Sequence, residues 1–242
     1  MTSLQPLFAM LAATLHFGPA VAAPIQSATD ATKLASVDIL SAQINIGETT
    51  ATFRMTLAGT AGETRIEPVG QLSGAPVHSY VWPTSLDPAT VGFEPGTGIL
   101  ALAATHHPDF DDTPLSDESA DGQKDNDGAV WHSHWVVLTQ NPTCGKGALA
   151  VRDIPEGETP QLPATWPGLP LFIDSPDFDT ALTADNIEIA LPLTAVAGLQ
   201  MAHFDAVTAA LRVNADLHAP LLCVTDVFDV ASGDLSLPGT VE

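Results

Sequence analysis

The stretch SVDILSAQINIGETTATFRMTLA, residues 36–58, decides the fold class. In its second half every other side chain is apolar: Ala51, Phe53, Met55 and Leu57. This period of two follows the turn residues Gly47 and Glu48 and is typical of a half-buried antiparallel hairpin. We therefore expect two paired strands here, with one face turned toward a core.

Further short strands are expected downstream, separated by turns rich in Gly, Pro, Asp and Asn. Their expected ranges are 63–69, 77–82, 98–104, 129–138, 148–154, 187–193, 207–213 and 221–230. Many short strands of this kind indicate an all-β fold, and we expect an antiparallel β-sandwich of the immunoglobulin or jelly-roll type. Long irregular loops are expected at 105–128 and 155–186, within a single domain that spans residues 36–242.

Three strand segments also resemble a known group of exported proteins. They are DILSA (38–42), TFRMTLA (52–58) and IEIALPL (187–193). Their pattern is similar to that of the DOMON and family-9 carbohydrate-binding β-sandwiches. The resemblance implies a sandwich fold and, for function, a haem or carbohydrate ligand.

The N-terminus has the features of a secretory signal peptide. Residues 1–22 contain no Asp, Glu, Lys or Arg, and a mostly apolar stretch is followed by the small-residue run Ala20-Val21-Ala22. We expect residues 1–22 to be a signal peptide and 23–35 a flexible leader; a buried N-terminal helix is the alternative. The chain would then be periplasmic or secreted, where its two cysteines, Cys144 and Cys223, form a disulfide.

The charge balance restricts the partners. The chain has 7 Lys and Arg against 29 Asp and Glu, a formal net charge of −22. Nucleic acids and anionic membranes both require a basic face on the protein. We therefore expect neither as a partner.

A strongly acidic segment, residues 109–127, predicts a calcium loop. Oxygen-bearing side chains recur at alternate positions around a glycine that permits a sharp turn: Asp117, Ser119, Asp121, Gln123, Asp125 and Asp127. This spacing allows a short loop to wrap several oxygens around Ca²⁺. Gly128 stands where an EF-hand has its bidentate Glu, so Asp127 or Asp112 would have to complete the shell. The alternative is an acidic loop that is simply solvated.

A cluster of histidines predicts a second metal site. In AVWHSHWVVL, residues 129–138, strand geometry sends His132 and His134 to one face, about 7 Å apart. At the end of the preceding expected strand, either His106 or His107, with Asp109 close behind, would complete the site. Such nitrogen and oxygen ligands suit Zn²⁺ or Cu²⁺. The alternative is that these histidines only bind carboxylates in a rigid loop.

Three functions follow from these patterns. The first is an exported metal-binding protein without turnover, and we favour it because acids and histidines share one continuous stretch. The second is a metal-dependent hydrolase or lyase, with a metal-bound water as nucleophile and Asp109 as general base. The third is a carbohydrate- or haem-binding module with a structural calcium ion, for which Tyr80 and Trp82 would supply a stacking surface.

Overall fold

The computed structural model describes residues 24–218 and 220–241, so the expected signal peptide, residues 1–22, lies outside the described part. The hairpin of residues 36–58 forms as predicted. Strand β2 (Ile39–Ile46) pairs antiparallel with β3 (Thr50–Leu57). Every second side chain of β3 is buried, which follows the sequence alternation.

This hairpin lies in a five-stranded antiparallel sheet. The strand order is β1 (Ile25–Gln26), β2, β3, β10 (Asn186–Pro192) and β9 (Asp179–Thr183). The presence of β1 corrects the expected flexible leader, because Ile25 is buried and pairs opposite Ala42. The Asp38 carboxylate further ties this segment down by accepting hydrogen bonds from Thr29 Oγ1 and the Asp30 amide.

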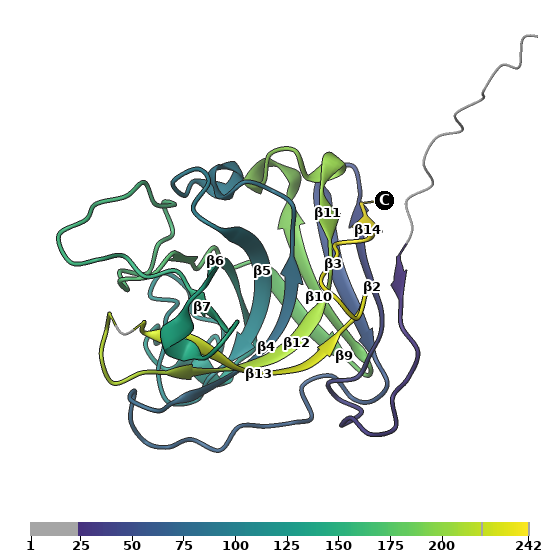
Figure 1. Cartoon of the computed structure of the whole chain (residues 1–242), viewed down its shortest axis with the longest axis horizontal. Coiled ribbons are helices and arrows are strands. Elements are labelled where there is room, and N and C mark those ends of the chain that lie inside the picture. Colours follow the sequence, from purple (N-terminus) through teal and green to yellow (C-terminus); the bar gives the residue numbers. More distant parts are fainter. Residues whose placement is uncertain (1–23, 219, 242) are drawn as a thin grey trace, which may run out of the picture.

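The second sheet closes into a six-stranded antiparallel barrel (Figure 1). Around the barrel the strands are β4 (Pro76–Pro83), β5 (Ile99–His106), β6 (His132–Gln140), β7 (Leu149–Val151), β13 (Leu222–Val230) and β12 (Val207–Val213). The pairing of β12 with β4 closes the barrel. The short strand β8 (Ile173–Asp174) pairs with β6 outside the barrel. The all-β, antiparallel prediction is confirmed, whereas the immunoglobulin or jelly-roll sandwich is not.

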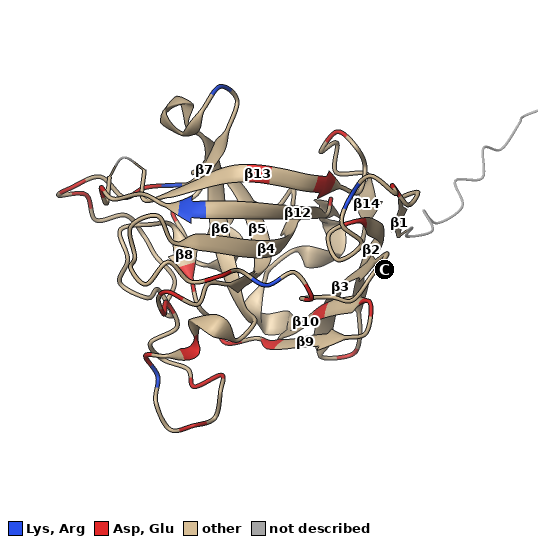
Figure 2. Cartoon of the chain, turned by 90° about the horizontal axis from the view of Figure 1, so that it is seen from below, with Lys and Arg blue, Asp and Glu red and all other residues tan. Residues whose placement is uncertain are grey.

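The barrel strands β4, β5 and β6 are buried on both faces and contribute to two apolar cores. In β5, Leu100, Leu102 and Ala104 join the core beneath the five-stranded sheet, where Phe53 packs edge-on against Trp82 and Trp135. The alternate residues of β5 join the core inside the barrel. None of β4, β5 and β6 contains a Lys, Arg, Asp or Glu, and Figure 2 shows the acidic residues mainly on loops around them.

The remaining elements are short. They are the strands β11 (His203–Phe204) and β14 (Gly239–Thr240) and the 3-10 turns η1 (Pro88–Val91), η2 (Asp127–Ala129), η3 (Pro142–Cys144), η4 (Leu193–Ala195) and η5 (Leu199–Met201). Within the described ranges, no helix has the length and apolar character needed to cross a bilayer. The expected strand at 63–69 does not form; Pro68, which lacks an amide hydrogen, interrupts it.

The predicted disulfide is confirmed. Cys144 at the end of η3 is bonded to Cys223 of β13, with 5.5 Å between their Cα atoms. The bond closes a loop with a sequence separation of 79 residues. In the chain-entropy model such a crosslink stabilises the fold by on the order of 4 kcal/mol.

Candidate metal centre

Two neighbouring barrel strands supply three imidazoles to one place inside the barrel. His132 and His134 are the first and third residues of β6, and His107 directly follows β5. β5 and β6 pair in register, with Thr105 opposite His132 and Ala103 opposite His134. The predicted placement of His132 and His134 on one strand face is thus confirmed, and Trp135 points the other way into the core under the five-stranded sheet.

The third histidine is His107 rather than His106. Alternation along β5 turns Ala101 and Ala103 into the barrel and continues through Thr105 to His107. His106 therefore lies on the outer face, where its ring contacts Trp131 at 5.5 Å. Of the two candidates left open by the sequence, only His107 reaches the cluster.

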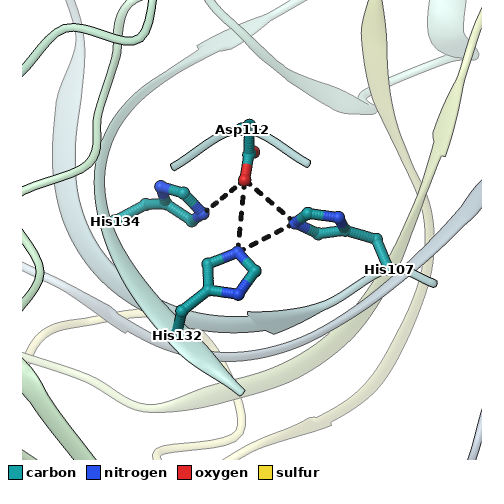
Figure 3. A group of neighbouring side chains, drawn as sticks. All are labelled: His107, Asp112, His132 and His134. Atoms are coloured by element: carbon teal, nitrogen blue, oxygen red, sulfur yellow. Dashed lines mark hydrogen bonds and ion pairs between the residues drawn. The ribbon is translucent and has the colours of Figure 1, made fainter. Parts of the chain in front are cut away.

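Asp112 offers the fourth atom that could bind a metal ion (Figure 3). Its Oδ1 lies 3.2 Å from both His107 Nε2 and His132 Nε2 and 3.3 Å from His134 Nε2. All four ligand atoms lie within 4.8 Å of one another, and no residue of the four is more than 6% exposed. Tetrahedral Zn²⁺, with bonds of about 2.0–2.1 Å, separates its ligand atoms by about 3.3 Å. The distances from Asp112 match that spacing.

The second nitrogen of each imidazole faces a hydrogen-bond acceptor. His107 Nδ1 lies 3.0 Å from Phe110 O, His132 Nδ1 lies 2.8 Å from Val130 O, and His134 Nδ1 lies 3.2 Å from Asp174 O. A neutral imidazole that donates through Nδ1 presents a bare lone pair at Nε2. All three Nε2 lone pairs therefore converge on the Asp112 carboxylate, and the buried His134 Nε2 has no hydrogen-bond partner. A cation at the common point would bind all four groups.

Ser175 and Gly128 hold the ligands in place. Ser175 Oγ donates to Asp112 O at 2.7 Å and lies 3.2 Å from His134 Nδ1, so it joins two of the ligand residues. Gly128 O accepts the His107 amide at 2.8 Å, and a Cβ at Gly128 would lie 1.8 Å from Phe110 O. This close approach explains why residue 128 is a glycine and not the Glu of an EF-hand: a residue without a side chain lets the loop pack against His107.

The electrostatics of the cluster favour a bound cation. Burial disfavours the ionised form of Asp112, but the charges of His107 and His134 outweigh it, so the pKa of this carboxyl lies well below its usual range. Burial also opposes protonation of His132, yet the hydrogen bond and charge of Asp112 raise its pKa. At His134 burial prevails and lowers the pKa. The centre thus contains a buried carboxylate that requires positive charge.

The centre borders a cavity in the barrel interior. The cavity has a volume of about 90 Å³ and is lined by His107, Asp112 and His134 together with mostly apolar side chains. We call this cavity the lumen. One side of the centre thus faces an apolar space rather than bulk solvent.

Asp109 is not part of this centre, contrary to the prediction. Its carboxylate accepts the amides of Val69 at 2.9 Å and Gly70 at 2.6 Å. It therefore fastens the irregular segment before β4 instead of reaching the histidines. Sequence reasoning misses Asp112 in this centre, because the loop pattern predicts it only as a calcium ligand.

The acidic loop does not assemble the predicted calcium ligands. The Asp117 carboxylate accepts hydrogen bonds from the amides of Asp121 and Gly122. The Asp121 carboxylate accepts one from the Gln123 amide. The buried Asp127 carboxylate accepts hydrogen bonds from the amides of Glu118 and Ser119. These carboxylates thus stabilise turns of their own loop. Among the described residues, only the His107, Asp112, His132 and His134 group brings three or more His, Cys, Asp or Glu ligand atoms this close together. Calcium binding by Asp117, Ser119, Asp121, Gln123, Asp125 and Asp127 is not supported.

Comparison of the chain with protein-family models, with curated proteins and with solved structures finds no match. The resemblance to the DOMON and family-9 carbohydrate-binding group therefore stays an expectation.

Proposed function

We propose that the chain is an exported transition-metal-binding protein whose His107, Asp112, His132 and His134 hold one Zn²⁺ or Cu²⁺ ion. One observation carries this proposal. Three Nε2 atoms and one carboxylate oxygen converge within 4.8 Å in a buried site, while each Nδ1 already faces an acceptor. Without a cation, this arrangement would leave buried lone pairs facing one another, which is costly.

The donor set favours a transition metal over Ca²⁺. Imidazole nitrogen suits Zn²⁺ and Cu²⁺, whereas Ca²⁺ takes six to eight oxygen ligands. Three nitrogens and one carboxylate oxygen therefore indicate Zn²⁺ or Cu²⁺.

Metal binding without hydrolysis is favoured over a hydrolase or lyase. A metal-bound water needs a nearby base to accept its proton. Asp109, the expected base, binds the Val69 and Gly70 amides, and Asp112 is itself a ligand. The other polar side chains described along the lumen are the hydroxyls of Ser79 and Thr105, which are poor bases at neutral pH.

The carbohydrate- or haem-binding alternative is less well supported. Tyr80 and Trp82, the expected stacking surface, are 3% and 0% exposed and belong to the core beneath the five-stranded sheet. The lumen, at about 90 Å³, is far smaller than the roughly 300 Å³ or more typical of ligand pockets. A haem would not fit in it.

Export to the periplasm or the exterior is part of the proposal. The Cys144–Cys223 disulfide supports it, since such bonds persist in oxidising compartments. The uncharged, apolar N-terminal sequence supports it as well.

Native mass spectrometry with elemental analysis tests the proposed function. Protein purified without a His-tag or chelator should carry one Zn or Cu per chain. The His132→Ala/His134→Ala variant should lose the metal and remain folded, while the control His203→Ala/His218→Ala, which removes two exposed histidines, should keep it. One-to-one binding retained in the first variant would place the metal elsewhere and refute the proposal.

A further inference from the structure

Apart from the metal centre, the lumen wall is apolar except for the hydroxyls of Ser79 and Thr105. Its side chains come from several barrel strands and include Val77, Val81, Val136, Val207 and Leu211. Of the two hydroxyls on the wall, Ser79 Oγ donates to Ala209 O at 3.0 Å, and Thr105 Oγ1 lies at the metal end, 3.2 Å from His132 Nε2. A molecule in the lumen would thus meet polar partners only at the metal end.

The lining of the lumen includes two exposed apolar side chains. Val227 of β13 and Leu235 also line it, yet they are 54% and 42% exposed. Large apolar side chains that are exposed together at a cavity often mark a ligand entrance. This is the place at which a small molecule would enter the lumen.

The volume limits the size of the occupant. An engineered apolar cavity of about 150 Å³ holds benzene, which has six heavy atoms. By the same proportion, the lumen at about 90 Å³ holds a group of about four heavy atoms. A chain of three or four carbons fits this limit.

The charge of the loaded centre selects the head group. A divalent ion with three neutral imidazoles and one ionised carboxylate leaves a net charge of +1 beside an apolar space. Burying an unbalanced charge in such surroundings is unfavourable, and a monoanion would cancel it. A carboxylate is both a monoanion and a good metal ligand. It would bind as a fifth ligand beside the four protein atoms, because zinc sites can expand from four to five ligands.

We propose that the lumen binds a short-chain carboxylate, with its head on the metal and its three- to four-carbon tail between β4, β6 and β12. This inference rests on the proposed function, because the metal holds the head group. It adds a ligand class and an entrance, at Val227 and Leu235, to the metal centre.

Titration calorimetry on the Zn²⁺-loaded full chain tests the inference with formate, acetate, propionate and butyrate. Affinity should rise about fourfold with each added methylene, because each one buries more apolar surface. Butyramide, which has the same shape but no charge, should bind at least tenfold more weakly than butyrate. Equal affinity for formate and butyrate, or for butyrate and butyramide, would overturn the inference.

A matched pair of variants locates the tail. Ala209 lines the lumen, whereas the next residue of β12, Ala210, points to the other face of the strand. Ala209→Leu should abolish the gain from formate to butyrate while formate binding persists, and Ala210→Leu should preserve the gain. The same gain in both variants would overturn the inference; should Ala209→Leu fail to fold, the chain-length series on the unaltered protein decides.

The outcomes separate the two proposals. A chain that binds no stoichiometric Zn²⁺ or Cu²⁺ refutes both the proposed function and this inference. A chain that binds one ion but shows no dependence on tail length refutes only the inference.

Discussion

His107 Nε2 lies 3.0 Å from His132 Nε2, although the Nδ1 of each ring already faces a backbone carbonyl oxygen. Two nitrogens that both present lone pairs repel each other at this distance unless a proton or a metal ion lies between them. Asp112 Oδ1, 3.2 Å from both, adds a third electron-rich atom. The pair is therefore the clearest sign that this part of the barrel is built around a cation.

Asp112→Asn tests the oxygen ligand. The amide has nearly the same shape but lacks the negative charge, so we expect Zn²⁺ affinity to fall by about 100-fold or more with the fold retained. Asp109→Asn is the matched control, since Asp109 lies in the same loop but binds the Val69 and Gly70 amides. Competition with a chromophoric chelator gives both affinities, and equal losses in the two variants would argue against Asp112 as a ligand.

Gly128→Ala tests the packing that positions His107. Its Cβ would lie 2.5 Å from His107 O and closer still to Phe110 O, so the loop must shift. We expect Zn²⁺ affinity to fall about 10- to 100-fold through displacement of His107. Gly122→Ala in the same loop is the control, because a Cβ at Gly122 meets nothing within 4 Å. The positive φ of Gly122 adds local strain in this variant, but no side-chain clash near His107. An unaltered affinity in Gly128→Ala would show that the packing does not position the ligand.

Metal affinity should rise with pH across the neutral range. Binding requires neutral imidazoles. The pKa of His132 is raised above its usual value of about 6.5, so in the metal-free chain a proton competes with the metal for this ring even at a pH above 6.5. The lowered pKa values of Asp112 and His134 keep these two groups ready to bind. We therefore expect Zn²⁺ affinity to increase about tenfold per pH unit below the pKa of His132 and to level off above it. An affinity independent of pH between 5.5 and 8.5 would contradict this.

Asp174 should make the metal-free fold less stable as pH rises. Burial raises the pKa of its carboxyl from 3.8 to about 6, so between these values the folded chain binds more protons than the unfolded chain. The free energy of unfolding then decreases with pH from about 4 and levels off above about 6. Asp174→Asn should remove this contribution and, at pH 7.5, stabilise the fold by about 1–3 kcal/mol. Urea denaturation at pH 4.5 and 7.5 measures the difference; an equal effect of the substitution at both pH values would refute the assignment.

Zinc, but not calcium, should stabilise the metal-free chain. A ligand present at 100 times its Kd adds about 2.7 kcal/mol, which for a domain of this size corresponds to a rise in Tm of about 5–10 °C. Calcium should leave the Tm unchanged, because Asp117, Asp121 and Asp127 use their oxygens on amides of their own loop. Thermal unfolding in each metal decides. A calcium-dependent rise that Asp121→Asn abolishes would restore the calcium loop.

The sequence predicts the local parts of the structure well, because strand alternation is a local property. The hairpin of residues 36–58 and the shared face of His132 and His134 both follow from a period of two. The same period, carried from Ala103 through Thr105, favours His107 over His106. This local alternation is therefore enough to choose between the two histidines.

The remaining features depend on contacts between distant segments. Barrel closure requires β4 to pair with β12, more than 100 residues later, and no local pattern specifies this. Asp112 is one of eight acids in residues 109–127. It is placed by Ser175, which follows β8, and nothing in the sequence of the loop distinguishes it.

X-ray absorption at the metal edge of the Zn²⁺-loaded chain identifies the atoms bound to the metal. We predict a first shell of nitrogen and oxygen at about 2.0–2.1 Å, with the multiple-scattering signature of three imidazoles. His107→Ala should reduce that signature to two imidazoles, while His106→Ala should leave three. A shell of oxygen atoms alone, or a signature that neither substitution changes, would contradict a metal centre formed by His107, Asp112, His132 and His134.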